Sequence, residues 1–441
     1  MKNKITRREA IIKTTFASGA FVAGFGNLAR SAESRSDPVT PLGTPRGMKG
    51  KESRVVWEHE PRAVKWDGTG MWWQDPNTDQ AVVDSMLSQG LRNLTDEPTA
   101  REAWTALFRH FNAGAAHKPG ERIAIKVNLN NVADPFDNNI DATQHTILAM
   151  LKSLLQDGGI PPQDIMVYDA TINPKVVRGR IPRRIYDYCR GPGGKLHAVL
   201  WMSSHEDEGV IKAVHTGKIL VYAKTEQDGN RCGTRIPTMV QTSKYIINMA
   251  LLKGHGTAGV SLTAKNHYGT IDAGKDHKYI DPLSTEYGPI PRYSPLVDLV
   301  GSPELGGKTL LFMIDALYGA LSVGGTPTRL APRPFNGQYP SSLLFSLDPV
   351  ALDSVGLDIM ADVYAHPEQP RKDEKVAARL PTANNYLREA ALAHKAPSGT
   401  QYIQQGKRLH SLGVHERGDL SASQIAQRYK TIRLVYGPSL G

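Results

Sequence analysis

Apolar and polar positions along the chain form two alternating patterns: short continuous apolar runs and longer amphipathic stretches. The apolar runs predict buried strands at Arg122–Val127, Ile165–Tyr168, Tyr245–Leu252, Thr309–Asp315 and Leu343–Leu347. Apolar side chains at helical spacing predict helices at Asp141–Leu155, which Gly158-Gly159 ends, and at Pro349–Met360, where Asp348 is the N-cap. Strands and helices in this order predict an α/β fold whose mixed, mostly parallel sheet is flanked by helices.

The segments around these elements define the expected domain organisation. The 41 glycines and 29 prolines of the 441 residues predict long Gly/Pro-rich loops. Residues 32–55 are rich in serine, proline, glycine and charged side chains, so we expect an extended arm or linker there. We expect residues 56–441 to form a single large α/β domain, with its core at about residues 122–365 and a C-terminal extension after it.

The first 31 residues have the pattern of an export signal. A basic start precedes a mild apolar stretch, Thr14–Phe25, and Ala29-Arg30-Ser31 offers small residues to a signal peptidase. The run Thr6–Lys13, with Arg7-Arg8, is similar to the twin-arginine consensus. We expect residues 1–31 to be a twin-arginine signal peptide and the protein to be periplasmic or otherwise exported, with no stable membrane anchor after cleavage. A cytosolic protein with a basic N-terminus is the alternative.

The formal net charge of +10 falls by half when this segment is set apart, because the segment holds six cations and one anion. The strongest basic cluster that remains comprises Lys175, Arg178, Arg180, Arg183 and Arg184. Two tyrosines follow this cluster but do not interleave with it, unlike the aromatic side chains of nucleic-acid-binding surfaces. We therefore expect a small anionic molecule and the twin-arginine export machinery as partners, and no nucleic acid.

The densest chemistry lies in the glycine-rich segment from residue 252 to residue 269. A strand leads into a predicted turn that holds Lys253 and His255, and a short helical stretch then places Lys265 and Asn266 near its end. Glycines let backbone N–H groups approach a ligand, and lysine and histidine add charge and a titratable base. The segment lacks the phosphate-binding and dinucleotide-binding fingerprints. It therefore predicts a site for a carboxylate, a phosphate or a developing oxyanion.

Four blocks of sequence resemble, in this order, the domain of unknown function family 362. They are Ala124–Asn128, Leu252–His255 with Ala264–Gly269, Ile314–Gly319, and Ser346–Asp353. The runs Tyr386–Ala391, Pro397–Thr400 and Ser411–Glu416 resemble the C-terminal region of its exported subgroup. The resemblance implies a fold and a site, and it does not imply a reaction.

The number of cysteines limits which cofactors the chain can bind. Some members of the family carry ferredoxin-like iron–sulfur modules, but two cysteines, Cys189 and Cys232, cannot supply a four-thiolate cluster. No iron–sulfur cluster is expected, and the cofactor is otherwise unknown. Whether the two cysteines form a disulfide stays open.

Polar residues at the ends of the predicted strands mark one rim of an expected cleft, since ligands of open parallel sheets bind there. Asn128, Asp169, Asp315 and Asp348 hold such positions, although Asp and Asn also cap helices and turns, and Asp348 fits a cap best. The expected substrate-binding residues are Lys126, Asn128, Asn266, Asp169 and Asp353. Asp353 falls in a helix that is apolar almost all round, so it needs a partner such as Lys126 or Lys265.

The preferred hypothesis is a hydrolytic, isomerising or eliminating enzyme that acts on a small anionic or polyhydroxylated metabolite. His255 would be the acid/base, Lys265 or Lys253 the electrophile or anion clamp, and Asp315 the orienting carboxylate. Structural alternatives stay open: an edge-strand role for Lys126, helix capping by Lys265 and Asn266, and a buried ion pair at Asp353.

Two other functions stay open. The first is a divalent metal site with ligands from His255, His267 and Asp272, in a window that also holds Asp276 and His277. The second is a non-catalytic periplasmic protein that binds a ligand or a cofactor in the same cleft.

Overall fold

A mixed β-sheet carries four of the polar residues singled out above: Lys126, Lys253, His255 and Asp315. The computed structural model describes residues 47–129, 137–171, 199–207, 209–217, 219–223, 233–272 and 289–438. Ten of their strands form this sheet, in the order β14-β1-β11-β10-β8-β2-β3-β4-β5, with β9 paired to β8. The bounds are β1 Arg54–His59, β2 Ile123–Lys126, β3 Ile165–Tyr168, β4 Leu200–Ser203, β5 Ile211–Lys212, β8 Tyr245–His255, β9 Gly259–Val260, β10 Thr309–Ala320, β11 Ser342–Ser346 and β14 Arg433–Pro438.

Most neighbouring strands of this sheet are parallel. Strands β10, β8, β2, β3, β4 and β5 each run parallel to the next, and β14 runs parallel to β1. Strand β11 is antiparallel to both β10 and β1. The expected mixed, mostly parallel sheet is confirmed. Two small antiparallel pairs lie outside it, β6 Ile219–Val221 with β7 Gly233–Arg235, and β12 Ile403–Gln404 with β13 Lys407–Arg408.

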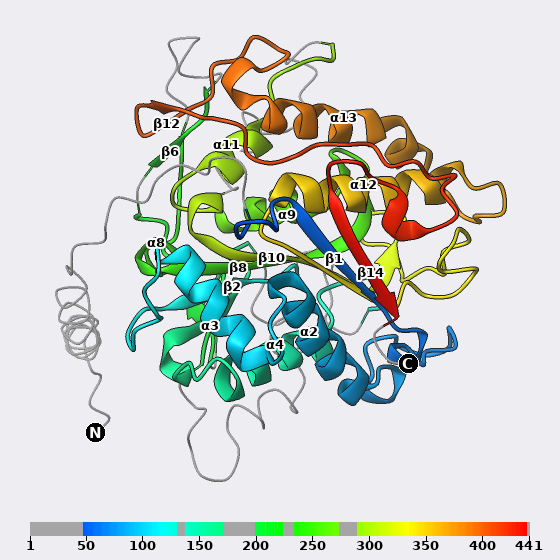
Figure 1. Cartoon of the computed structure of the whole chain (residues 1–441), viewed down its shortest axis with the longest axis horizontal. Coiled ribbons are helices and arrows are strands. Elements are labelled where there is room, and N and C mark those ends of the chain that lie inside the picture. Colours follow the sequence, from blue (N-terminus) through cyan, green and yellow to red (C-terminus); the bar gives the residue numbers. More distant parts are fainter. Residues whose placement is uncertain are drawn as a thin grey trace, which may run out of the picture. The chain divides into compact units, whose positions relative to one another are not determined.

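Helices cover both faces of the sheet (Figure 1). One face packs against α2 Gln80–Thr95, α3 Ala100–Phe111 and α4 Gln144–Gln156. The other packs against α9 Thr263–Asn266, α11 Pro295–Gly301, α12 Pro349–Ala365 and α13 Glu374–Ala391. Side chains alternate between the two cores along a strand: Ile123 and Ile125 belong to the first and Ala124 to the second. The strands therefore read as continuous apolar runs, because both faces are buried.

Shorter helices complete the described residues. Helix α8 spans Thr238–Thr242, and 3₁₀ turns occur at Pro61–Ala63, Asp75–Asn77, Pro162–Asp164, His267–Thr270, Gly306–Lys308, Ala393–Lys395 and Ile425–Gln427. No helix among the residues described is both long and apolar enough to span a membrane.

The predicted elements are present, with shifted ends. Strand β3 has the expected bounds, whereas β8 and β10 run three and five residues beyond Leu252 and Asp315. Helix α12 begins at Pro349 as expected, since the Asp348 carboxylate accepts the N–H groups of Val350 and Ala351. It continues to Ala365, because α13 covers a further apolar turn.

The C-terminal extension returns to the sheet. Helix α13 lies over β9 and α12, and β14 then adds a parallel strand beside β1 (Figure 1). Arg54 and Val55, expected in a linker, are the first residues of β1, because β11 and β14 supply hydrogen bonds on both its sides. The described residues belong to one compact unit, Pro41–Gly441. The expected signal peptide, Cys189, Cys232, His277 and the basic cluster from Lys175 to Arg184 lie outside the described residues.

Candidate functional site

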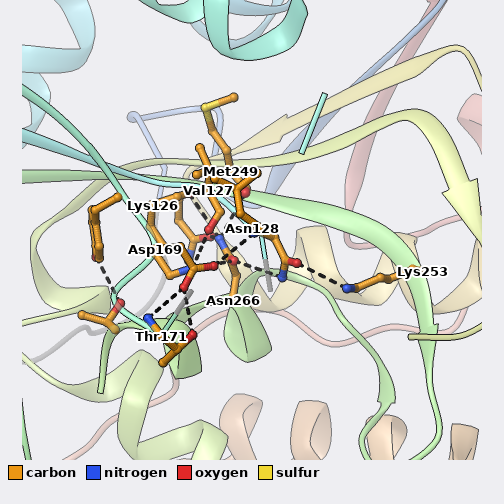
Figure 2. A network of polar contacts seen from close by, with 12 residues as sticks. Lys126, Val127, Asn128, Asp169, Thr171, Met249, Lys253 and Asn266 are labelled. Carbon is orange, nitrogen blue, oxygen red and sulfur yellow. Dashed lines mark hydrogen bonds and ion pairs between the residues drawn. The ribbon is translucent and has the colours of Figure 1, made fainter. Parts of the chain in front are cut away.

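A network of polar side chains lies where β2, β3 and β8 approach α9. Lys126 ends β2, Asp169 follows β3, and α9 supplies Asn266 beside β8 (Figure 2). Their side chains are between 0% and 2% exposed. Such burial requires that every charge and amide be matched, so the partners of each group indicate its role.

Lys126 and Asp169 form a buried ion pair with additional hydrogen bonds. The Lys126 Nζ lies 3.2 Å from Asp169 Oδ2, and it also donates to the carbonyl of Val127 at 2.5 Å. The Asp169 carboxylate accepts further hydrogen bonds from the N–H groups of Leu129 and Thr171 and from the Thr171 hydroxyl. Burial lowers the pKa of Lys126, and the Asp169 carboxylate opposes this shift. Both members of the ion pair therefore have further hydrogen bonds that fix their positions.

Asn266 connects this pair to the rest of the network. Its Oδ1 accepts from Lys126 Nζ at 3.3 Å and from Asn128 Nδ2 at 3.5 Å. Its Nδ2 donates to Asn248 Oδ1 at 2.8 Å and to the carbonyl of Met249 at 3.1 Å. An amide can do this because it carries both a donor and an acceptor. The expected polar residues Lys126, Asn128, Asp169 and Asn266 thus come together.

Lys253 lies at the other end of the network, joined to it through Asn128 (Figure 2). Its Nζ donates to Asn128 Oδ1 at 3.3 Å, and its side chain is as deeply buried as that of Lys126. Burial lowers the pKa of Lys253 to about 7; Lys265 and Lys126 lower it too, while Asp141 and Asp169 oppose the shift. At neutral pH this amine therefore exists in both protonation states.

His255, two residues along the same strand, has a fixed tautomer. Its Nδ1 accepts hydrogen bonds from the N–H groups of Thr257 and Ala258, both at 3.2 Å, and from the Thr257 hydroxyl at 2.8 Å. In the neutral ring the proton is then on Nε2. Burial, with Lys265 and Lys253 nearby, lowers the pKa of His255 to about 2. His255 is therefore neutral near pH 7 and carries a hydrogen-bond donor at Nε2.

The segment that carries these residues belongs to a known family. The model of the family described as "Domain of unknown function (DUF362)" matches residues 123–358, more than half of the chain. The chain belongs to the DUF362 family. Neither a search of curated proteins nor a search of solved structures found a match. All the residues of the network lie inside the DUF362 span.

The glycine-rich segment of this DUF362 domain is a β-hairpin, so Lys253 and His255, which were expected in the turn, belong to strand β8. Strand β8 continues to His255 and pairs with β9 through Gly254↔Val260 and His255↔Gly259. A Cβ on Gly254 would overlap the carbonyl oxygen of Leu321, and Gly259 has a φ of +83° with a carbonyl of α13 at 2.5 Å from its would-be Cβ. These two glycines therefore allow close packing of the hairpin.

Asp315 and Asp353 support helix starts of the DUF362 fold. The Asp315 carboxylate accepts from the N–H and hydroxyl of Thr143 at the start of α4, and burial raises its pKa to about 6. It does not orient His255, whose own loop does so. Asp353 accepts from Thr263 and from the N–H of Ala264 at the start of α9, and from the Tyr386 hydroxyl. These donors replace the expected cation partner.

The three expected metal ligands do not assemble into a site. No group of three or more His, Cys, Asp or Glu side chains that could hold a metal occurs in the described ranges. His267 is fully buried against the edge of Phe312, and neither ring nitrogen has a hydrogen-bond partner among the described residues. Burial, with Lys126 nearby, lowers the pKa of His267 to about 3. The backbone of Asp272 bonds to that of Arg235.

Three residues of the site were not expected from the sequence. Asn248 lies beside Lys126 in the β2–β8 register and donates to the Thr263 carbonyl. Asp141 is buried and acts electrostatically on Lys253 and Lys126. Gly269 leaves room for the ion pair, since a Cβ there would lie 2.7 Å from Lys126 Nζ. Only Asn248 gave a signal, as a lone amide within an apolar run.

Proposed function

We propose that this DUF362 protein is an enzyme that binds a small anionic metabolite at the lysine cluster, defined as Lys126, Lys253 and Lys265. The observation that carries the proposal is Lys253, a buried amine held by one amide oxygen at the carboxyl end of a parallel strand. Ligands of open α/β sheets bind at such ends. A buried lysine with a pKa near neutrality is suited to acid or base catalysis.

Charge balance supports an anionic ligand. Asp169 is already used by Lys126, and Asp141 is the other carboxylate that acts on Lys253. Three cations against two anions leave an excess positive charge whenever Lys253 is protonated. A bound anion would stabilise that protonated form, so its binding should be accompanied by proton uptake near pH 7.

The roles proposed for the individual groups differ from those expected from the sequence. Lys253 would give or take the proton. The Nε2–H of His255 would donate to an oxygen on which negative charge develops, and Lys265, whose Nζ lies 3.8 Å from the centre of the Tyr268 ring, would hold the anionic group. A hydrolysis, an isomerisation or an elimination can proceed by such proton transfers.

The test begins with the ligand that co-purifies with the protein from its native host, identified by untargeted mass spectrometry. Purified protein is then given that compound, and its conversion is followed by NMR. We expect Lys253→Met to abolish conversion and Lys407→Met, which removes an exposed lysine on β13, to leave it unchanged. Equal turnover by the wild type and Lys253→Met would refute the assigned role. Binding without conversion would instead identify a ligand carrier.

We also propose that the protein reaches the periplasm through the twin-arginine pathway, as a member of the exported DUF362 subgroup. The support is the run around Arg7-Arg8 and the small residues at Ala29 and Ser31. Cell fractionation of the full chain tests this. The double variant Arg7→Lys/Arg8→Lys should stay in the cytoplasm, while Lys2→Gln should be exported as the wild type is. Export of the double variant would exclude the pathway.

A further inference from the structure

Three lysines of the described chain are almost completely buried, and one of them has far fewer partners than the others. Lys126 has the Asp169 carboxylate and two further oxygens. Lys308 donates to the carbonyls of Val240 and Gln241 and to the Glu304 carboxylate. Lys253 has a single hydrogen-bond acceptor among the described residues, the amide oxygen of Asn128 at 3.3 Å. A buried ammonium so poorly matched is costly, which favours the neutral amine.

We infer that Lys253 is a nucleophilic amine that forms a Schiff base with the carbonyl carbon of an oxo acid. The inference deepens the proposed function and rests on it, because it names the substrate class of the same site; the neutral amine that would accept a proton there is the amine that attacks the carbonyl carbon. A desolvated lysine beside another cationic group is a recognised form of activated amine nucleophile. Lys253 has both features, since it is buried and both Lys126 and Lys265 act on it.

The step balances without an oxidant or a reductant. The Lys253 nitrogen attacks the carbonyl carbon, a C–N bond forms, and the C=O π electrons move to oxygen. That oxygen takes one proton as the nitrogen loses one, which gives a carbinolamine. The hydroxyl group then leaves as water with a second proton from the medium, and the C=N bond remains as a protonated imine. The Nε2–H of His255 is a donor suited to the developing oxyanion.

Charge favours a single carboxylate on the substrate. Two positive and two negative charges act on Lys253. The charges of Lys126 and Lys265 are balanced by those of Asp141 and Asp169. The protonated imine adds one positive charge, and one carboxylate of an oxo acid neutralises it. Lys265 and His255 both keep part of their surface exposed, whereas Lys253 and Lys126 do not.

The experiment traps the imine. The full-length protein is incubated with pyruvate and cyanoborohydride, which delivers hydride to the C=N bond and leaves a stable secondary amine, and peptide mass spectrometry locates the adduct. Hydroxyacetone, a ketone without a carboxylate, is the matched control compound. We expect an adduct on Lys253 with pyruvate, its loss with hydroxyacetone, and a yield that rises as pH increases through about 7. Lys126 and Lys308 should stay unmodified.

Two variants and one binding measurement keep the outcomes distinct. Lys253→Met removes the amine, and Lys253→Arg keeps a cation that does not form the imine; both should lose the adduct. Pyruvate binding is followed in the same samples by thermal shift. Binding without an adduct at Lys253 overturns the Schiff-base inference and leaves the anion-binding proposal standing. If pyruvate neither binds nor forms an adduct, the Schiff-base inference and the anion-binding proposal are both contradicted. An adduct spread over surface lysines overturns the inference.

Discussion

The two ends of the polar network bury the same kind of side chain in different ways. At one end Lys126 meets a carboxylate, a carbonyl and an amide oxygen, and the carboxylate has donors of its own. At the other end Lys253 meets one amide oxygen. Both side chains are 1% exposed, so burial alone does not separate them. The difference in partners supports the proposed roles, in which Lys126 maintains the architecture of the site and Lys253 carries its chemistry.

The two lysines lie at different places along the strands. Lys126 lies within the sheet, between β3 and β8, where Tyr168 and Asn248 are its neighbours in register and Asp169 follows directly. Lys253 lies where β8 leaves β2 and turns into the hairpin with β9. There β10 flanks it through Ala320, and the segment that follows β9 bonds to its other side through Ser261. The same position leaves it beside Lys265 and His255, the two partly exposed members of the site.

The largest expected effect comes from breaking the Lys126 end. Asp169→Ala leaves the Lys126 ammonium buried without its carboxylate, which should reduce the free energy of unfolding by about 3–5 kcal/mol. Urea denaturation at pH 7 measures this loss. The double variant Lys126→Met/Asp169→Leu removes both charges and should recover most of the stability. An equal loss in the single and double variants would mean that packing, and not the ion pair, accounts for the effect.

The second prediction concerns the pH dependence of stability at the Lys253 end. The pKa of Lys253 is about 7 in the folded chain and about 10.5 in the unfolded chain, so between these values the unfolded chain binds more protons. The proton that Lys253 binds only in the unfolded chain therefore makes wild-type stability rise with pH, by about 1.4 kcal/mol per unit. Lys253→Met lacks this titrating group. Relative to the wild type it should be most stable at pH 7 and below, with an advantage that shrinks toward pH 9.

Urea denaturation at pH 6, 7, 8 and 9 gives the slope for each protein. Lys308→Met is the contrasting variant, because it leaves the buried Glu304 carboxylate without its cation. It should be destabilised at every pH. A difference between Lys253→Met and the wild type that does not change between pH 7 and pH 9 would contradict the assigned state of the amine.

The third prediction tests the space around the ion pair. In Gly269→Ala the added Cβ lies 2.7 Å from Lys126 Nζ and 2.9 Å from Asp169 Oδ1, so one of the two groups must move. Overpacking of this kind should cost about 1–3 kcal/mol of stability. Gly437→Ala in β14 is the matched control, because a Cβ there meets no heavy atom within 4 Å. Equal stability of the two variants would show that the pair tolerates displacement.

Much of the sheet could be predicted because its parallel strands are buried on both faces. Continuous apolar runs such as Ile165–Tyr168 carry that signal directly. Strand β1 could not be predicted in the same way, because its partner β14 lies at the other end of the chain and their pairing is not encoded locally. The pairing of β8 with β9 could not be predicted, because the glycines of this segment suit a loop as well as a hairpin.

The residues of the site were easier to predict than their roles. Lys126, Asn128, Asp169 and Asn266 follow from polar positions at strand and helix ends, where the topology brings them together. The tautomer of His255 and the small number of partners of Lys253 depend on side-chain directions that no spacing reveals. Asp315 was expected to be catalytic and Asp353 to bind substrate, because both are carboxylates in apolar elements, yet each accepts hydrogen bonds at the start of a helix.

The smallest expected effect sharpens the comparison between the two ends. Lys265→Met removes the cation above the Tyr268 ring and should change stability by about 0.5–1 kcal/mol. It also removes a positive charge that lowers the pKa of Lys253, so that pKa should rise. Competitive acetylation of the folded protein, mapped by peptide mass spectrometry across pH, reports the midpoint at which Lys253 becomes reactive. The midpoint should move to higher pH in Lys265→Met and stay unchanged in Lys407→Met. A midpoint that does not move would mean that Lys265 does not affect the pKa of Lys253. Lys126 would then be the only cationic neighbour of Lys253 among the described residues.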